Sequence, residues 1–248
     1  MSYNYDLNTH NKTDPSIIVP LLIDLFSPTS VIDIGCGLGN FLFEFKKNSI
    51  CDVLGVDGDM FSDIKRAEFL APNEFLRGDL TKSLNINRKF ELALCLEVAE
   101  HLPLSAADQL VKELISISDI VVFSAAVPLQ GGQFHVNEQW QSYWAEKFKK
   151  YNYCPVDCIR PVIWNNMKVS YWYKQNLVVY ISKNSKKYNE RVNLSMSYFN
   201  IVHPENYFGQ VDYLHKLLSG KSDLKFYLYL LFKYFKNFVS LKSYHKDV

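Results

Sequence analysis

Short runs of apolar residues alternate with amphipathic segments through the first half of the chain. The segments between the runs repeat their apolar positions at the period of a helix, over residues 40–47, 61–67 and 105–117. The runs themselves are rich in Val, Ile, Leu and Phe and predict strands at residues 31–34, 52–57, 74–77, 90–96 and 119–126. Strands that alternate with helices predict a mostly parallel sheet covered on both faces.

Further elements flank this alternation. Asp14 reads as an N-cap followed by proline at the first helical position, and the helix it starts is expected to end near Ser27. Beyond the alternating part, a helix is predicted over residues 137–149 and strands near 155–160 and 176–182. The predicted fold class is therefore α/β, with a doubly wound, seven-stranded, mostly parallel sheet.

The last quarter of the chain differs in charge from the rest. Residues 183–248 contain 11 Lys and Arg against 5 Asp and Glu, whereas the whole chain contains 27 and 26. Two helices are expected within residues 205–248, and the second of them is rich in aromatic residues and lysine. We therefore predict an α/β catalytic domain at residues 1–182 and a basic, aromatic-rich helical extension at residues 183–248.

The apolar run in the second of these helices, residues 224–236, is too short to span a membrane. It is expected either to pack on the domain or in a homodimer, or to lie on a membrane surface as a basic, aromatic helix. The pattern alone leaves both readings open.

Composition adds three bounds. With 48% hydrophobic residues and a net charge of +1, the chain can bury a full core and has no overall nucleic-acid signature. Its five cysteines are an odd number without paired metal-ligand spacing, which indicates reduced thiols. The polar start of the chain carries no export signal, so a cytoplasmic protein is expected, with the inner face of the membrane as an alternative place.

Residues 31–40, VIDIGCGLGN, carry the first chemical signal. A short strand runs into Gly35, Gly37 and Gly39, and a helix follows at once, which is typical of a nucleotide cradle. A dinucleotide fingerprint needs a further glycine where this chain has Asn40. The pattern D-x-G-x-G-x-G instead resembles the first motif of class I methyltransferases that use S-adenosyl-L-methionine (SAM).

Three later strand ends extend this resemblance. Asp57 closes the second strand, where an acidic side chain accepts hydrogen bonds from ribose hydroxyls in folds of this kind. Gly78, Asp79 and Leu80 follow the third strand and resemble the family segment that holds adenine. The resemblance implies a Rossmann-like methyltransferase fold over about residues 14–182, with Asp33 and the three glycines of the turn holding the methionine part of SAM.

A second group of residues follows the fourth strand. Glu97, Glu100 and His101 stand at i, i+3 and i+4, so a helical turn would place them on one face. The segment E-x-x-E-H resembles the metal-binding stretch of ubiquinone-pathway O-methyltransferases and of enzymes that methylate small-RNA 3′ ends. In the RNA enzymes a downstream histidine completes the site, and here His135 is the candidate.

These four residues predict a site for a divalent cation, whether magnesium, manganese, iron or zinc. Without a metal, His135 is the candidate general base, with His101 and Glu100 as the other catalytic candidates. The histidine and the glutamates could also be ordinary hydrogen-bonded residues at a helix start.

A narrower resemblance concerns the acceptor. The segment HVNEQW at residues 135–140, with the phrases IRP at 159–161 and WYKQN at 172–176, resembles methyltransferases of bacterial surface-polysaccharide biosynthesis. This implies a hydroxyl of a sugar or glycan as the acceptor, and Trp140, Trp144, Trp164 and Trp172 are candidates for stacking on sugars. The alternatives are a small phenol or quinone precursor, an RNA 2′-hydroxyl, which the acidic residues 1–182 disfavour, and a non-catalytic SAM-fold subunit.

Overall fold

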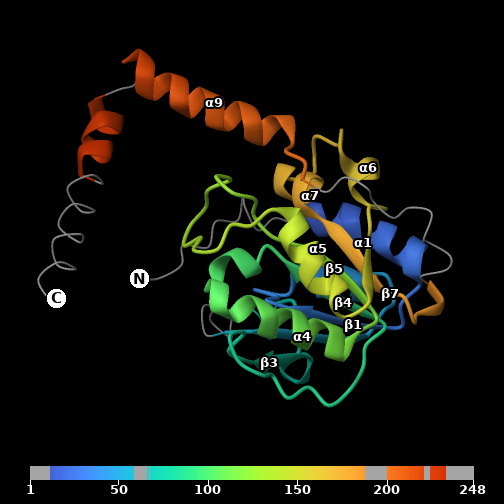
Figure 1. Cartoon of the computed structure of the whole chain (residues 1–248). Helices are drawn as coiled ribbons and strands as arrows, with labels where there is room; N and C mark the ends of the chain where they lie inside the picture. Colours follow the sequence, from blue (N-terminus) through green and yellow to red (C-terminus); the bar gives the residue numbers. More distant parts are fainter. Residues whose placement is uncertain (1–11, 59–65, 67, 188–199, 221–223, 233–248) are drawn as a thin grey trace, which may run out of the picture. The chain divides into compact units, whose positions relative to one another are not determined.

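A seven-stranded sheet forms the centre of the protein (Figure 1). The computed structural model describes residues 12–58, 66, 68–187, 200–220 and 224–232. The strand order is β3-β2-β1-β4-β5-β7-β6, and β7 runs antiparallel to both of its neighbours while the strands from β3 to β5 are mutually parallel. The predicted doubly wound, mostly parallel sheet is confirmed.

The elements lie close to their predicted places. The strands are β1 Ser30–Ile34, β2 Asp52–Asp57, β3 Phe75–Arg77, β4 Leu92–Leu96, β5 Ile120–Ser124, β6 Tyr153–Val156 and β7 Val178–Ser182. The α-helices are α1 Thr13–Phe26, α2 Asn40–Lys47, α4 Ala107–Ile117, α5 Gln141–Lys149, α6 Arg160–Ile163, α7 Tyr171–Asn176 and α9 Pro204–Ser219. Short 3₁₀ turns cover Pro72–Glu74, Ala99–His101 and Leu104–Ala106. The predicted helix 61–67 falls, except for residue 66, outside the described residues.

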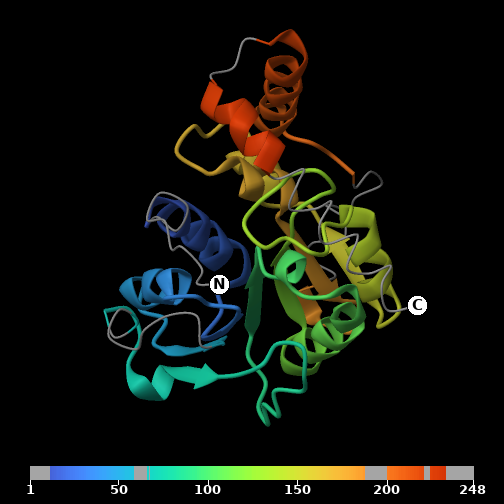
Figure 2. The same cartoon turned by 90° about the vertical axis from the view of Figure 1, so that its left-hand side faces the viewer.

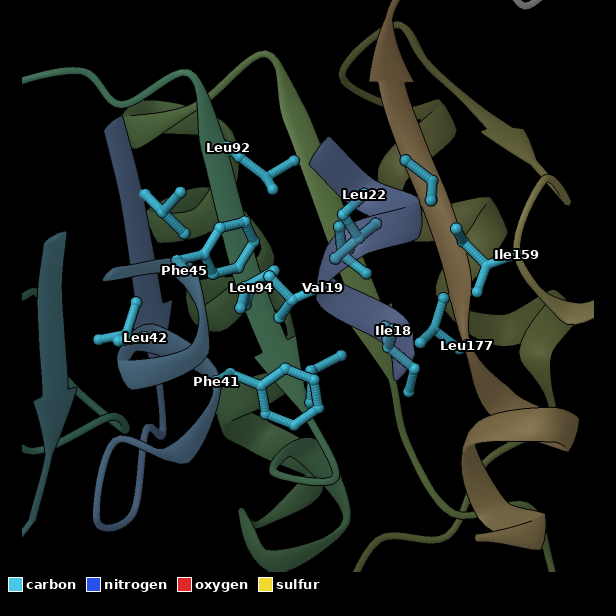
Figure 3. Packing of buried hydrophobic residues seen from close by; sticks show 14 of the residues in the cluster. Ile18, Val19, Leu22, Phe41, Leu42, Phe45, Leu92, Leu94, Ile159 and Leu177 are labelled. Atoms are coloured by element: carbon cyan, nitrogen blue, oxygen red, sulfur yellow. The ribbon is translucent and has the colours of Figure 1, made fainter. Parts of the chain in front are cut away.

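Alternating side chains of the strands bury two cores, one on each face of the sheet. In β4, Leu92 and Leu94 face the core that α1 and α2 cover, whereas Ala93 and Cys95 face the core under α4 and α5. Figure 3 shows the first core, where side chains of α1 and α2 pack on β4. In Figure 2 the blue helices α1 and α2 lie on one side of the sheet and the green to yellow-green helices α4 and α5 on the other.

Two helix starts differ from the prediction. α1 begins at Thr13 after an N-cap at Lys12, and Asp14 is buried instead, where it accepts hydrogen bonds from the backbone N–H and Oγ of Ser170, both at 2.7 Å. α5 begins at Gln141, later than predicted, because the backbone N–H of Asn137 is bonded outside a helix, to the carbonyl of Glu100. In both cases a distant partner competes with the local helix signal.

The strand order reverses between β1 and β4, where a doubly wound sheet binds its ligands at the carboxyl ends of the strands. The two loops that leave β1 and β4 touch there. A Cβ on Gly35 would lie 2.3 Å from Cγ2 of Val98, so any side chain at position 35 would collide with the loop after β4. This places the glycine turn directly beside the Glu97–His101 segment.

The chain divides into two compact units, residues 1–203 and 204–248. The first unit continues past β7 to His203, beyond the 182/183 boundary predicted from composition. The reason lies in hydrogen bonds: the carbonyl of Ile201 accepts from Nε2 of Gln141 at 3.0 Å, and the backbone N–H of His203 donates to Oε1 of Gln175 at 2.9 Å. Among the described residues, none of the helices has the length and apolarity needed to cross a bilayer.

Candidate active site

The turn after β1 brings backbone N–H groups to the carboxyl end of the sheet. Gly35, Gly37 and Gly39 have φ of +84°, +58° and +94°, a region that side chains disfavour. The N–H groups of Gly35 and Cys36 both donate to the carbonyl of Val56, at 2.7 and 3.1 Å, which ties the turn to β2. α2 begins directly after the turn, so its first N–H groups face the same space.

Asp57 joins the end of β2 to this turn. Its Oδ2 accepts a hydrogen bond from the N–H of Gly37 and its Oδ1 one from the N–H of Gly58, both at 2.6 Å. Burial raises the pKa of Asp57, and these two bonds together with Arg66 act in the opposite direction. Each carboxylate oxygen keeps a second lone pair, which suits the predicted role as acceptor for ribose hydroxyls.

Asp33 lies within β1 and is only 3% exposed. Burial, and to a smaller extent the charge of Asp57, raises the pKa of Asp33 from 3.8 to about 7. A buried carboxylate of this kind is stabilised in its charged form by a nearby cation. The sulfonium and ammonium groups of SAM are cations, so a buried carboxylate next to the glycine turn suits this cofactor.

Asp79 and Leu80 follow β3 at the same edge of the sheet. The carboxylate of Asp79 accepts hydrogen bonds from the N–H and Oγ1 of Thr81, at 3.0 and 2.6 Å, and pairs with Lys82 Nζ at 3.0 Å. These bonds lower the pKa of Asp79 to about 2. Leu80 packs against the core under α4. The adenine contact of Asp79 and Leu80 stays a prediction.

The segment after β4 departs from the helical turn assumed in the sequence analysis. Glu97 has φ of +53°, and its N–H donates to the carbonyl and Oγ of Ser124, at 3.0 and 3.1 Å. The following turn, Ala99–His101, is 3₁₀. The left-handed Glu97 lies outside that turn, so the i, i+3, i+4 spacing does not put all three side chains on one helical face.

The loop after β5 is bonded onto the same turn. The N–H groups of Val136 and Asn137 both donate to the carbonyl of Glu100, at 2.8 and 3.0 Å. Within the loop, Nδ1 of His135 lies 2.9 Å from Oε1 of Glu138, a carboxylate that also accepts from the N–H of Gly131 at 2.7 Å. Because Nδ1 donates to a carboxylate, the lone pair of His135 is at Nε2.

Glu100, His101 and His135 thereby come together. One ligand atom from each lies within 4.8 Å of the others, and the two imidazole rings are 4.9 Å apart, edge to face. Glu100 is fully buried, and its carboxyl group interacts with the carboxyl of Glu97 and with the backbone of Ala126, although no described residue gives it a hydrogen bond of regular geometry. Burial and the neighbouring Glu97 raise the pKa of Glu100 well above its usual range. A cation among these atoms would satisfy the buried carboxylate, so the three residues fit a divalent metal.

Glu97, the fourth predicted ligand, is held by amides instead. Nδ2 of Asn176 donates to its two carboxylate oxygens at 3.2 and 3.4 Å, and Nε2 of Gln130 donates at 3.4 Å. Oε1 of Gln130 in turn accepts from Asn176 and from Gln175, at 3.0 and 2.9 Å. This amide network was not identified as part of the site from the sequence, although three amides near the ends of β5 and α7 are the signal that could have indicated it.

The four tryptophans have different surroundings. Trp144 is buried in the core against Phe123, which excludes it from stacking on a sugar. Trp140 is 40% exposed and, with Tyr143 and polar neighbours, lines a groove of about 360 Å³. Trp140 stands five residues after His135 in the chain, at the end of the loop that carries this histidine.

Comparison with known proteins supports the same fold. Residues 31–118 match the family described as a methyltransferase domain. The magnesium protoporphyrin IX methyltransferase of Synechocystis PCC 6803, solved with bound SAH, is similar over 74% of this chain and 90% of its own, with 17% identity and a TM-score of 0.50.

The plantazolicin methyltransferase, in complex with a desmethyl analogue and SAH, is similar over 71% of this chain and 85% of its own, with 14% identity and a TM-score of 0.49. No protein with a curated description matches the sequence. At 17% identity the likeness to the Synechocystis enzyme is one of fold.

Proposed function

We propose that this chain, a SAM-dependent methyltransferase by its fold and its matched domain, transfers the methyl group to a hydroxyl oxygen of a sugar or glycan in surface-polysaccharide biosynthesis. The observation that carries the proposal is the cluster of Glu100, His101 and His135, with ligand atoms within 4.8 Å of one another beside the glycine turn. An alcohol is a poor nucleophile at neutral pH, and this cluster can take its proton.

In this proposal the cofactor residues are those predicted. Asp33, Gly35, Gly37 and Gly39 hold the methionine part of SAM, Asp57 the ribose, and Asp79 with Leu80 the adenine. The chain's main task is to align the acceptor oxygen with the sulfonium methyl and to exclude water. The reaction is an in-line displacement, so no covalent intermediate on the protein is needed.

We propose further that Glu100, His101 and His135 hold a divalent cation, magnesium, manganese, iron or zinc, with Glu97 next to it. When bound, such an ion would favour the alkoxide form of the acceptor hydroxyl. Glu138 supports this arrangement, because its carboxylate 2.9 Å from Nδ1 leaves Nε2 of His135 available. If no cation binds, the same Nε2 is the general base.

A sugar acceptor is favoured over a phenol by the polarity around the cluster. Glu97, Gln130 and Asn176, although bonded to one another, surround the cluster with carboxylate and amide groups, and such polar surroundings suit an acceptor with several hydroxyls. The exposed Trp140 beside the loop could stack on a neighbouring sugar unit. A compact phenol pocket would instead be lined by apolar side chains.

The test is methyl transfer from labelled SAM to three acceptor classes: extracted surface glycans, catechols and RNA oligonucleotides. We expect label in the glycans, loss of transfer after exhaustive chelation and recovery with added metal. Label only in catechol or RNA would refute the sugar acceptor, and full activity after chelation would assign the proton transfer to His135 alone. If calorimetry shows SAM binding but no acceptor is labelled, the proposal fails in favour of a non-catalytic subunit.

A further inference from the structure

The second unit of the chain exposes large apolar side chains in a regular pattern. In α9, Tyr207, Val211, Leu214 and Leu218 stand at i, i+4, i+7 and i+11, so they lie along one side of the helix. Their exposed fractions are 59%, 43%, 54% and 80%. Phe208, 66% exposed, widens this side.

The helical residues 224–232 repeat the pattern. Leu224, Leu228 and Leu231 stand at i, i+4 and i+7, and each is more than half exposed. Tyr229 and Phe232 add exposed rings. Lys225 is the single charged residue in this stretch of nine.

These two helices use other side chains to contact each other. The rings of Tyr213 and Phe226 lie 5.8 Å apart, and the hydroxyl of Tyr227 donates to the carbonyl of Lys216 at 3.0 Å. We call α9 and residues 224–232 together the helical hairpin. The leucines therefore stay exposed after the two helices of the hairpin have packed together. A contiguous exposed apolar surface of this kind is typical of an interaction site.

The composition of the unit indicates what covers this surface. Residues 204–248 contain seven lysines and four acidic residues, with eleven Tyr and Phe. Two of the lysines, Lys216 and Lys225, lie in the hairpin, where Lys216 pairs with Asp212 at 2.6 Å, and the other five stand in the sequence around residues 224–232, at 221, 233, 236, 242 and 246. Leucines and aromatic rings bury themselves at the boundary of headgroups and acyl chains, while lysines interact with anionic headgroups. A coiled-coil partner would instead require one apolar seam flanked by charged positions, and residues 224–232 have no such charged flanks.

We propose that the helical hairpin docks on the surface of an anionic membrane, with its exposed leucines and aromatic rings inserted below the headgroups. This inference goes beyond the proposed reaction and does not depend on the acceptor. It would hold the enzyme at the surface of a bilayer.

The experiment is sedimentation of the full chain with vesicles of phosphatidylcholine alone and of phosphatidylcholine mixed with phosphatidylglycerol. We expect binding to the mixed vesicles that weakens as salt is added, since each lysine near an anionic surface contributes about fivefold. The variants Leu214→Glu/Leu218→Glu and Leu228→Glu/Leu231→Glu should each reduce partitioning about tenfold or more, because two apolar side chains no longer insert.

The matched control is Leu104→Glu/Met167→Glu, which makes the same charge change at exposed apolar positions of the first unit, 58% and 85% exposed. It should bind vesicles as the unmodified chain does, and circular dichroism should show all variants folded. Absence of vesicle binding, or an equal loss in the control, would overturn the proposal. A second result would also overturn it. If the unmodified chain does not bind vesicles but forms a dimer in analytical ultracentrifugation, and the hairpin variants are monomeric, the partner of the hairpin is a second copy of the chain.

Discussion

A single carboxylate, that of Asp57, links the end of β2 to the glycine turn. Asp57 accepts two backbone hydrogen bonds at 2.6 Å and is also the expected acceptor for ribose. The side chain therefore shapes the turn before any ligand arrives. This explains why an acidic residue, rather than any polar one, is useful at the end of β2, since both its oxygens must accept.

Asp57→Asn should weaken SAM binding about tenfold or more. The amide keeps one acceptor but presents N–H groups toward Gly37 or Gly58, and hydrogen bonds to a charged group are worth roughly 1.5–3 kcal/mol. Isothermal calorimetry with SAM measures the effect, with Asp52→Asn at the start of the same strand as the control. Equal affinities in the folded Asp57→Asn variant and the unmodified chain would contradict the assignment.

The raised pKa of Asp33 predicts that the free energy of unfolding depends on pH. Its pKa is about 7 in the folded protein against an ordinary value of 3.8, so between these values the folded state binds more protons than the unfolded one. The contribution of Asp33 to the free energy of unfolding is therefore neutral below pH 3.8 and becomes more unfavourable as the pH rises toward 7.

Asp33→Asn should remove this slope. Between pH 5 and pH 8 the unmodified, SAM-free chain should lose more stability than the variant, by about 2.5 kcal/mol, because a slope of about 1.4 kcal/mol per pH unit acts from pH 5 up to the folded pKa of about 7. Urea denaturation at the two pH values measures the difference, and the subtraction cancels the other titrating groups. Parallel pH profiles for the two proteins would show that Asp33 ionises normally in the folded state.

A substitution at Gly132 should displace the ring of His135 while leaving the histidine itself in place. A Cβ at position 132 would lie 2.2 Å from Nε2 and 2.3 Å from Cε1 of His135. The ring is the end of a flexible side chain, so Gly132→Ala should shift the ring, leave the fold intact and reduce kcat by about tenfold or more. Gly209→Ala, where a Cβ meets no atom within 4 Å, is the matched control. Unchanged kcat in Gly132→Ala would argue against a role for His135 in the reaction.

At the scale of elements, the bounds of a helix or strand could be predicted best where the local sequence pattern and the tertiary contacts favour the same structure. The predicted bounds of α2 and β2 are those observed, because glycines precede the helix and the strand alternates into two cores. The turn after β4 was less predictable, since the left-handed Glu97 depends on Ser124 in a neighbouring strand. The same holds for Asp14, whose partner Ser170 is distant in the chain.

The residues of the candidate site also fall into those that could be predicted from the sequence and those that could not. Residues of the glycine turn and the strand ends could be identified because backbone geometry and spacing dictate them. The meeting of Glu100, His101 and His135 was predictable from strand order, whereas the amides of Gln130 and Asn176 were not. The amides themselves stand visibly near the ends of β5 and α7 in the sequence, but their pairing with Glu97 depends on tertiary contacts between the β5 loop and α7.

Asn176→Ala tests the network between these two elements. It removes donors to Glu97 and Gln130 and leaves buried acceptors unsatisfied, so stability should fall by about 1–3 kcal/mol and kcat should fall with it. Chemical denaturation and single-turnover kinetics measure the two effects. Asn166→Ala, which removes the bond from the N–H of Lys168 to Oδ1 within an exposed turn, should change neither substantially. A variant that loses stability but keeps kcat would limit the network to a structural role.

At the scale of the whole molecule, the boundary at His203 can be tested by truncation. A chain of residues 1–203 should fold and bind SAM with unchanged affinity, because the sheet and the glycine turn lie within it. A chain of residues 1–182 should be less stable, since Gln141 and Gln175 lose the hydrogen bonds that reach Ile201 and His203. Thermal melts and SAM calorimetry compare the two. Equal melting temperatures would place the boundary at residue 182.

The position of β7 has a consequence for how the protein is made. β7 is the last strand of the sheet to be synthesised, yet it fills an interior place between β5 and β6. Until residues 178–182 leave the ribosome, β5 is an edge with unpaired N–H and C=O groups, the kind of edge that pairs with foreign strands. The glycine turn and the ends of β2, β3 and β4, where we expect SAM to bind, are complete earlier in the chain. During translation, therefore, the nascent enzyme passes through a stage with its cofactor cradle assembled and its sheet still open to aggregation.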